Sequence, residues 1–472
     1  MGTVAARKNF KLKGIEDALE MSDKELERNY KEFINPYFLQ LLKLLKLNKR
    51  FKKAKGIKLW DTNGEEYFDF LGAYGAINLG HNNEDVIRKV NMIRETPNLI
   101  QTAIQPLAAI LAENLAMITP GDLKYTFFCN SGAEAVEGAL KLAKIATGKH
   151  RIIYCKGSFH GKSLGALSVT GREKYKKHYG PMVPMNTEVE YGDITELRNA
   201  INYYDDIAAF IFEPIQGEGG IITPPEGYLK EASELCRDKK IILIADEVQT
   251  GFGRTGYWFA CEKENIVPDI LCMAKSLGGG IMPMGAYIAN KQVWKKGYGS
   301  LDKCLLHTST FGGNAWGCAA AIATIEVIQE EELELAAMEK GEYFISQLKS
   351  LMEKHNILVD VRGQGLMIGL EFRNASTSNR LINNLLGSHN EMLNEYFGGM
   401  IASELANKYR IITAYTLNNP NVIRVEPPLT LTYSEIDYFV ESLESVLKNF
   451  KGLSGMTIQT AKNLFAKIDR EA

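Results

Sequence analysis

The residues best suited to chemistry in this sequence stand at the ends of short apolar runs. Lys275 follows the run 269–273, and Asp246 follows the run 241–245. A lysine at the end of a buried strand is partly desolvated, which lowers the pKa of its amine and frees it to attack a carbonyl carbon. A carboxylate in such a position is costly unless it meets a cation or hydrogen-bond donors. Because a lone lysine is ordinarily a surface residue and a lone aspartate often caps a turn, neither assigns a function alone.

Two further segments add groups of other kinds. Ser131 and Gly132 open a predicted helix, and the first N–H groups of a helix form a phosphate site, although Ser131 could simply cap that helix. Phe159 stands between Gly157 and Gly161, so its ring could offer a face to a planar ligand, although a lone Phe is more often core. A phosphate site, a ring face, a carboxylate and a Schiff-base lysine are together the groups that pyridoxal 5′-phosphate needs. The combination predicts that cofactor, with Asp246 opposite the pyridine nitrogen.

Competing cofactors are disfavoured. The segment Gly251–Gly256 fits the GxGxxG dinucleotide pattern literally, but residues 246–250 separate it from its strand. The residues that follow, 257–260, do not begin a helix in the way that pattern requires. No His, Cys or carboxylate cluster has metal-ligand spacing, so we predict no metal site. The cysteines show no paired spacing, which predicts a reducing compartment without structural disulfides.

The composition is that of an ordinary soluble enzyme. Hydrophobic residues make up 45% of the 472-residue chain and charged residues 24%, with a formal net charge of −2. This balance gives no reason to expect a nucleic-acid or membrane partner. No uncharged apolar run reaches the roughly 18 residues of a membrane span, and the first residues do not form a signal peptide. We therefore expect a cytoplasmic protein.

The order of apolar and helical stretches predicts an α/β fold. Strands are expected at 125–129, 151–155, 207–212, 241–245 and 269–273, and later at 359–362, 365–372 and 422–425. Apolar strands separated by helices indicate a mostly parallel sheet buried on both faces, and such sheets bind ligands outside the carboxyl ends of their strands. Residues 85–345 would form a large domain. Residues 1–84 would form an N-terminal extension and part of a small domain, which residues 346–472 complete.

Two local features precede the large domain. Residues 15–47 are predicted to be helical in two pieces, interrupted at Asn35-Pro36, because proline disfavours a helix interior. Residues 57–60 and 67–70 are predicted to form a hairpin with an Asn63-Gly64 turn.

The chain resembles the class III aminotransferases, of the ornithine and 4-aminobutyrate type, over nearly its whole length. The matching segments are Ser131–Glu134, Phe159–Gly161, Glu213–Gly220, Asp246–Gly256, Lys275 and Thr310–Asn314. The resemblance implies a pyridoxal-phosphate-dependent transferase of fold type I. Such a fold has a mostly parallel seven-stranded sheet flanked by helices and a smaller α+β domain built from both chain ends.

The resemblance also implies a role for each matching residue. Lys275 would bind the cofactor covalently and then move a proton on the substrate, while Asp246 would pair with the pyridine nitrogen. The other cofactor contacts would be Ser131, Gly132 and Ala133 at the phosphate, Phe159 and Val248 on the two ring faces, Gln249 at the phenolic oxygen, and His160 and Glu213 nearby.

A substrate-binding pair and a dimer follow from the same resemblance. Glu218 would mask Arg424 while an amine is bound and release it to bind a carboxylate of 2-oxoglutarate, a task that suits the bidentate guanidinium. Thr310 would reach the phosphate in the neighbouring subunit. This implies a homodimer with shared active sites, and a tetramer remains open.

Within the family the chain most resembles the putrescine aminotransferases. The segments behind that likeness are 35–36, 124–131, 159–166 and 423–432. Lys162 stands where ornithine and acetylornithine enzymes often carry an arginine, and a diamine would not need that carboxylate clamp. Gln101 resembles a residue that lines the diamine pocket from the partner subunit. Tyr74 departs from the putrescine pattern and would narrow the pocket.

The expected activity is therefore transfer of an amino group from a diamine to 2-oxoglutarate, giving an aminoaldehyde and glutamate by a ping-pong mechanism. Ornithine, acetylornithine or 4-aminobutyrate is the alternative donor. A racemase or mutase of the same fold would share Lys275 and Asp246 but would need no keto acid. A cofactor-binding regulatory protein is a further alternative, although it would not need the pair formed by Glu218 and Arg424.

Overall fold

The computed structural model describes residues 12–373 and 397–449, and the chain divides into two compact units, residues 1–50 and 51–472. The first unit contains α1 (Ile15–Leu19), α2 (Asp23–Asn29), a π-helical turn (Tyr30–Ile34) and α3 (Pro36–Leu44). The Asn35 side chain caps α3 by accepting hydrogen bonds from the N–H groups of Tyr37 and Phe38, each at 3.1 Å. The predicted break at Asn35-Pro36 is confirmed. The piece before it is itself divided, because Ser22 caps α2 and so separates it from α1.

A small sheet opens the second unit and joins distant parts of the chain. Its strand order is β1-β2-β3-β13, with β1 (Phe51–Lys55), β2 (Lys58–Asp61), β3 (Glu66–Asp69) and β13 (Ile411–Ile412). Strands β2 and β3 form the predicted hairpin. The Asp61 carboxylate accepts from the N–H groups of Asn63 and Glu65 at 2.9 Å each, and Gly64 takes φ 85° in the turn. Because β13 runs parallel to β3, segments before and after the large sheet meet here.

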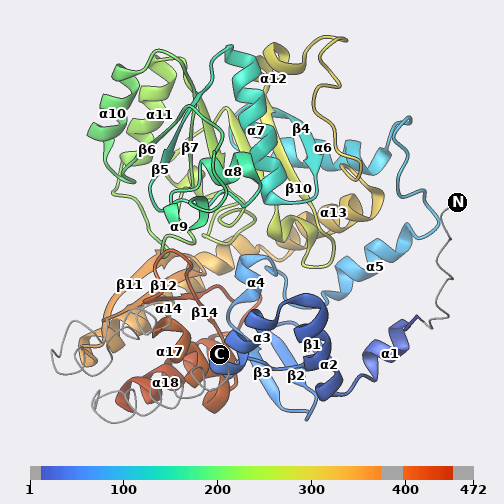
Figure 1. The fold of residues 1–472 in the computed structure, drawn as a ribbon, viewed down its shortest axis with the longest axis vertical. Coiled ribbons are helices and arrows are strands. Elements are labelled where there is room, and N and C mark those ends of the chain that lie inside the picture. The colour runs from blue at the N-terminus through green and yellow to red at the C-terminus, as the bar shows by residue number, and fades with distance from the viewer. Residues whose placement is uncertain (1–11, 374–396, 450–472) are drawn as a thin grey trace, which may run out of the picture. The chain divides into compact units, whose positions relative to one another are not determined.

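The large sheet has seven strands in the order β4-β10-β9-β8-β7-β5-β6 (Figure 1). They are β4 (Leu123–Cys129), β5 (Arg151–Cys155), β6 (Asn186–Val189), β7 (Ile207–Phe212), β8 (Ile242–Asp246), β9 (Ile270–Met273) and β10 (Gly285–Asn290). All pairings are parallel except those of β10, which runs antiparallel to β4 and β9. The predicted mostly parallel seven-stranded sheet is confirmed, as are the five strands expected from apolar runs.

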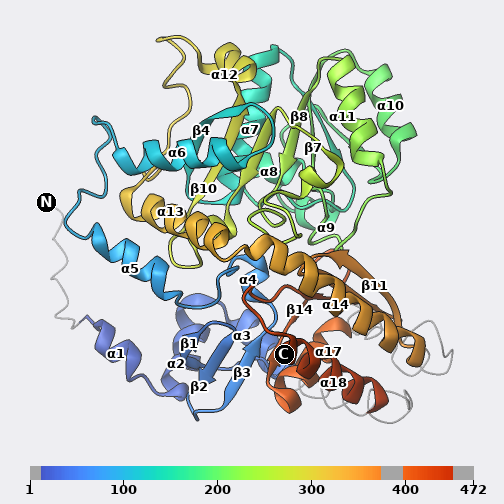
Figure 2. The ribbon, with the colours of Figure 1, turned by 180° about the vertical axis from the view of Figure 1, so that it is seen from behind.

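Alternate residues of each strand face opposite layers of helices. In β8, Ile242 and Ile244 pack in the cluster that contains α7, whereas Leu243 and Ala245 pack in the cluster on the other face. Figure 1 shows α7 over one face, and Figure 2, seen from behind, shows α6 over the other. By this alternation Asp246 belongs to the α7 face. The helices of this region are α5 (Glu84–Met92), α6 (Pro106–Ile118), α7 (Gly132–Thr147), α8 (Leu164–Ser168), α9 (Glu173–Lys176), α10 (Ile194–Tyr203), α11 (Tyr228–Asp238), α12 (Lys291–Tyr298) and α13 (Ala315–Glu330).

The last sheet is antiparallel and carries Arg424. Its order is β11-β12-β15-β14, with β11 (Leu358–Gln364), β12 (Met367–Phe372), β14 (Ala414–Tyr415) and β15 (Val422–Val425). The three later predicted strands are confirmed, but β12 begins at Met367 because Gly365 makes the turn with φ 54°. Helices α14 (Leu333–Lys354), α17 (Phe397–Tyr409) and α18 (Tyr433–Asn449) complete this part. The domain boundaries at 84 and 345 stay a prediction.

Candidate active site

A cavity of about 500 Å³ lies at the carboxyl ends of the parallel strands. Its walls come from the segments that follow β4, β5, β7, β8 and β9, and from the segment before the antiparallel β10. The structure brings these predicted residues together in its lining: Ser131, Gly132, Ala133, Phe159, His160, Lys162, Glu213, Asp246, Val248, Gln249 and Lys275. The position agrees with the rule that open α/β sheets bind ligands at this edge.

Lys275 lies two residues beyond β9 and is half-buried. It opens a short 3-10 helix, η3 (Lys275–Gly278), with φ 46°, a left-handed conformation that is uncommon for a residue with a side chain. Burial lowers the pKa of its amine, and the carboxylate of Glu426 opposes this effect most strongly among the nearby charges. The position therefore holds an amine that loses its proton more easily than a surface lysine.

Asp246 and His160 form a buried pair. The Asp246 Oδ2 lies 2.6 Å from His160 Nδ1, and its Oδ1 accepts from the Val248 N–H at 3.1 Å. The His160 N–H of the backbone donates to Thr170 Oγ1 at 3.1 Å, which fixes the ring beside the strand end. Within the described residues, His160 Nε2 is buried without a hydrogen-bond partner. A buried polar atom of this kind on a residue of the cavity wall can form a hydrogen bond with a ligand.

Glu213 ties two of the cavity segments together. Its carboxylate accepts from the N–H groups of Phe159 at 2.8 Å and Gly217 at 3.1 Å. Burial raises the pKa of Glu213 to about 7, against the lowering effect of His160. The two hydrogen bonds from backbone N–H groups orient the segment that carries Phe159, so Glu213 helps to position that ring.

The start of α7 closes one side of the cavity. Ser131 Oγ accepts from the Glu134 N–H at 3.2 Å and caps the helix. The N–H groups of the first turn have no carbonyl partner within their helix, so those of Gly132 and Ala133 can bind an anion. A Cβ atom on Gly132 would lie 2.8 Å from Val248 Cγ1, so the backbone there approaches the other wall more closely than any side chain allows.

Arg424 lies beside the cavity, between two carboxylates. Its guanidinium is fully buried and lies 2.7 Å from Glu218 Oε2 and 3.4 Å from Glu426 Oε2. The Tyr74 ring stands 5.2 Å from the same guanidinium. Burial by itself would lower the pKa of Arg424, but the two carboxylates raise it above its usual range. The guanidinium therefore stays charged and pairs with two carboxylates.

Glu426 is a candidate site residue that the sequence did not predict. It is fully buried and accepts from Gln249 Nε2 at 2.7 and 3.0 Å. One signal was available in the sequence. Glu426 stands two residues after Arg424, and residues two apart in extended chain share a face.

Lys162, Gln101 and Thr310 lie further out. Lys162 is exposed at the cavity wall, with its ammonium 5.0 Å from the Tyr175 ring. Gln101 donates to the carbonyl oxygen of Thr310, and both residues are exposed and outside the cavity lining. The structure thus brings the last two together but not to the cavity of their own chain.

The glycine-rich segment Gly251–Gly256 is a turn. The next regular element is η2 (Ala260–Glu264), a 3-10 helix, and Arg254 is fully buried with its Nη2 donating to Asn78 Oδ1 at 2.6 Å. This segment packs the fold together and does not start a helix. Within residues 12–373 and 397–449, no group of three metal-ligating side chains occurs. Among the helices described, none is long and apolar enough to cross a membrane.

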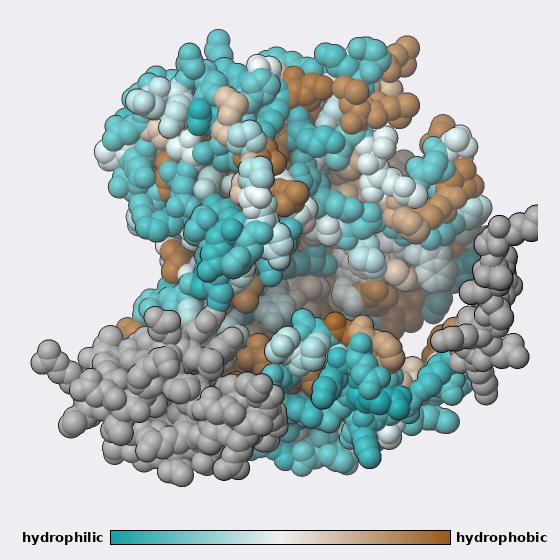
Figure 3. All heavy atoms as spheres, viewed as in Figure 1, coloured by the Kyte–Doolittle hydropathy of each residue, from teal (hydrophilic) through white to brown (hydrophobic). Residues whose placement is uncertain are grey.

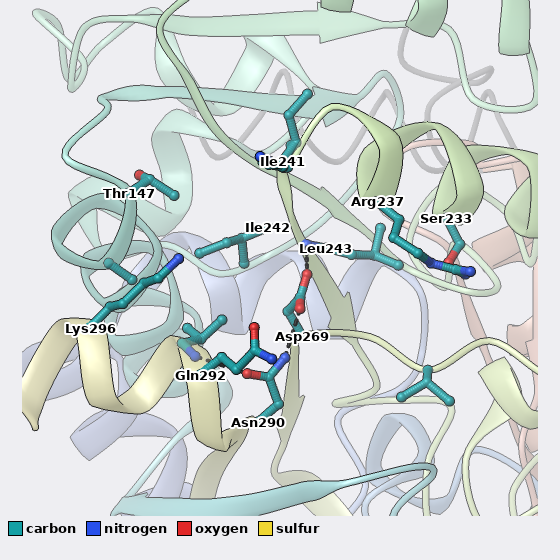
Figure 4. A pocket seen from close by; sticks show the side chains of 14 residues that line it. Thr147, Ser233, Arg237, Ile241, Ile242, Leu243, Asp269, Asn290, Gln292 and Lys296 are labelled. Carbon is teal, nitrogen blue, oxygen red and sulfur yellow. Dashed lines mark hydrogen bonds between the residues drawn. The ribbon is translucent and has the colours of Figure 1, made fainter.

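A second cavity, of about 430 Å³, lies at the opposite edge of the sheet (Figure 4). It is lined by the start of β8, by Asp269 and Asn290, and by the cationic side chains Arg237, Lys240 and Lys296. The Asp269 oxygens accept from the Leu243 N–H at 2.9 Å and from Asn290 Nδ2 at 2.7 Å. The three cations are exposed.

Comparison with known proteins extends over nearly the whole chain. A family model described as aminotransferase class III matches residues 45–447. An ornithine aminotransferase from Toxoplasma gondii, whose structure has pyridoxal phosphate at partial occupancy in its active site, is 27% identical with a TM-score of 0.79, covering 93% of this chain and 99% of that one. An (S)-enantioselective omega-transaminase from Thermomicrobium roseum is 26% identical with a TM-score of 0.81, covering 93% and 100%. An acetylornithine aminotransferase from Elizabethkingia anophelis is 29% identical with a TM-score of 0.70, covering 88% and 99%.

Proposed function

We propose that this chain, which belongs to the class III aminotransferases, moves a terminal amino group from a diamine such as putrescine to 2-oxoglutarate. Its fold is that of the fold type I enzymes, and its cofactor is pyridoxal 5′-phosphate. The observation that supports a diamine donor is the pairing of Arg424 with Glu218 and Glu426. An arginine already matched by carboxylates leaves the site ready for a substrate without a carboxylate.

The cavity fits the cofactor group by group. The free N–H groups at the start of α7 suit a phosphate, and Phe159 and Val248, both half-buried, suit the two faces of a ring. Asp246, buried and bonded to His160, suits a protonated ring nitrogen. When bound, the cofactor supplies a ring that accepts electrons from the substrate carbon.

Lys275 is proposed to bind the cofactor and to move the proton. The pKa of its amine is lowered because it is buried, so it loses its proton more easily than a surface lysine and can then attack a carbonyl or accept a proton. The Gly278–Gly280 segment beside it includes two residues with positive φ, Gly279 at 63° and Gly280 at 70°. A Cβ atom on Gly279 would lie 2.6 Å from Thr324 Oγ1, so glycine is needed for this turn to pack beside Lys275.

Arg424 is proposed to bind the keto acid in the second half of the reaction. The ion pair with Glu218 at 2.7 Å would open, and the guanidinium would then donate two hydrogen bonds to a carboxylate of 2-oxoglutarate. The backbone N–H of Leu417 donates to Glu218 Oε2 at 2.9 Å, so Glu218 keeps a partner if it leaves Arg424. One site can thus serve an amine and a dicarboxylate in turn.

A homodimer is proposed to complete the site. The segment after α12 exposes Leu301 (95%) and Leu305 (77%), and the segment before α6 exposes Ile104 (94%). Figure 3 shows hydrophobic residues gathered on these segments. Exposed apolar surface of this kind marks an interaction site. Thr310 and Gln101, which contact each other beside this surface, would then reach the partner's cavity.

Ornithine or acetylornithine is the second candidate donor. Enzymes for both substrates are among the similar structures. Lys162 at the cavity wall offers a point charge to a donor carboxylate, although it lacks the planar fork of an arginine.

A half-reaction scan tests the proposal. Purified enzyme loaded with cofactor would be mixed separately with putrescine, cadaverine, ornithine, acetylornithine and 4-aminobutyrate while the absorbance of the bound cofactor is followed. 2-Oxoglutarate would then be added. We expect fast absorbance loss with the diamines and recovery with the keto acid. Absorbance loss with ornithine or acetylornithine alone would replace the diamine by the second candidate.

A further inference from the structure

Glu426 contacts three separate parts of the fold. It follows β15, and its own N–H donates to the Phe70 carbonyl oxygen at 2.8 Å. Its side chain accepts from Gln249, which follows β8, and lies 3.4 Å from Arg424. The side chain has no exposed surface. A carboxylate so placed is tolerated only because these donors and the cation compensate its desolvation.

The backbone of residues 72–75 packs closely against Glu426. All four residues have positive φ, from 50° at Ala73 to 73° at Gly75. A Cβ atom on Gly72 would lie 2.4 Å from the Glu426 carbonyl oxygen, and one on Gly75 would lie 3.2 Å from Glu426 Oε1. Left-handed backbone is unfavourable at the two non-glycine residues, Ala73 and Tyr74. Backbone strain retained beside Glu426 favours a functional role for this arrangement.

Arg424 pairs with two carboxylates, Glu218 and Glu426. The charge of the other fully buried arginine, Arg254, also acts on Glu426, although its guanidinium donates to Asn78 Oδ1 at 2.6 Å and to the Leu366 carbonyl oxygen at 3.0 Å. If Glu218 moved aside, Arg424 would still have Glu426. The two carboxylates also raise the pKa of the Lys275 amine, and Glu426 has the largest effect of any nearby charge.

We propose that Glu426 is a specificity-determining residue, a second carboxylate on Arg424 that favours cationic amine donors and disfavours substrates carrying a carboxylate. The inference rests on the proposed function, which names the amine and the keto acid. Specificity of this kind comes from a repulsive element as much as from an attractive one. The negative charge repels a donor carboxylate and weakens the hold of Arg424 on 2-oxoglutarate, whereas a dication gains from it.

The test compares Glu426→Gln with the wild-type holoenzyme. The amide keeps the shape and one acceptor but removes the charge. We expect kcat/KM for putrescine to fall about 10-fold, the preference for putrescine over ornithine to fall at least about 10-fold, and KM for 2-oxoglutarate to fall roughly 3-fold. A pH titration of the bound cofactor's absorbance should shift to lower pH by about 0.5–1 unit, because a nearby negative charge no longer stabilises the protonated form.

Two further variants make the result decisive. Glu426→Asp keeps the charge and should restore most of the donor preference and the titration. Glu371→Gln is the matched control, because Glu371 also pairs with an arginine, Arg362, between β11 and β12 but away from the cavity. That variant should leave both readouts unchanged.

The outcomes separate the two proposals. Equal loss with every donor and an unshifted titration would show that Glu426 is only structural and would overturn the inference. If the wild type accepts no diamine, the proposed function fails, and so does the donor preference assigned to Glu426. A shifted titration in that case would show only that its charge acts on the site. If Glu426→Gln does not fold, a normal donor preference in Glu426→Ser would overturn the inference, and a lost preference would support it.

Discussion

The two cavities lie at opposite ends of the same strands and have similar volumes, about 500 and 430 Å³. Each contains an aspartate from the β8–β9 region and at least one lysine. The difference is in burial and in the direction of the helices. Lys275 is half-buried and the Asp246 side chain pairs with a histidine whose far nitrogen is free within the described residues, whereas Lys296 is exposed and both Asp269 oxygens are bonded by neighbouring strands (Figure 4).

Helix polarity separates the two ends further. Helix α7 begins at the first cavity, with Ser131 as its cap, and ends at the second, where Thr147 lines the wall. Helix N-termini present N–H groups and favour anions, whereas C-termini present carbonyl oxygens. We therefore expect the same residue types to support chemistry at one edge of the sheet and only structure at the other. Matched substitutions in the two cavities test this difference.

The largest effect is expected from the lysines. Lys275→Ala should retain the fold and lose at least about 10⁴-fold in transamination, because both the covalent attachment and the proton transfer are removed. Lys296→Ala should stay within about 2-fold of wild type. Turnover numbers with the best donor and 2-oxoglutarate measure both. Normal turnover in Lys275→Ala would contradict the mechanism.

The aspartates should differ by a smaller factor. Asp246→Asn should lower kcat/KM about 10²- to 10³-fold, because the amide no longer stabilises a protonated ring nitrogen. Asp269→Asn should leave kcat unchanged and lower the free energy of unfolding by about 1 kcal/mol through its weakened hydrogen bonds. Steady-state kinetics and urea denaturation of both variants make the comparison. A loss of kcat in Asp269→Asn would show that the second cavity also acts on turnover.

An arginine from each cavity can be compared by its effect on KM for 2-oxoglutarate. Arg424→Lys should raise KM for 2-oxoglutarate about 10- to 100-fold, because an ammonium cannot replace a bidentate guanidinium. The amine half-reaction should change much less. Arg237→Lys, in the second cavity, is the control and should leave that KM unchanged. An unaltered KM in Arg424→Lys would place the keto-acid carboxylate elsewhere.

The smallest effect is on stability and its pH dependence. Burial raises the pKa of Glu213 from its usual 4.5 to about 7. The folded protein therefore binds a proton that the unfolded chain releases, and this group stabilises the fold at low pH and loses that contribution as pH rises toward 7. The free energy of unfolding should fall by about 1 kcal/mol per pH unit between about pH 5 and about pH 6.5 on account of this group.

Glu213→Gln should remove that slope. Urea denaturation of both proteins across this pH range measures it, as the difference between the two curves. Parallel curves would mean that Glu213 does not titrate in the range.

Much of the fold followed from the sequence. Five strands of the large sheet could be predicted from apolar runs, which are most continuous in β7 and β8 because these strands are buried along their whole length. Two strands could not. Strand β6 is an edge strand with the polar sequence Asn-Thr-Glu-Val, and β10 begins with small residues because a Cβ on Gly285 would lie 2.5 Å from the Ser131 carbonyl oxygen. An exposed edge strand and a strand that needs small residues for close backbone packing both lack the run of large apolar residues by which strands are predicted.

The sequence by itself determined which groups the site has and the edge of the sheet where they gather, since Lys275 and Asp246 stand at the ends of predictable strands. The resemblance implied that Glu218 pairs with Arg424, but it did not predict that Glu426 also contacts this arginine. Arg424 meets Glu218 from the β7 side, and Glu426 meets Gln249 from the β8 side, only because separate sheets fold against one another. Pairing energies depend on distance and burial, which chain order does not encode. The tertiary structure alone therefore decided that this arginine is shared by two carboxylates.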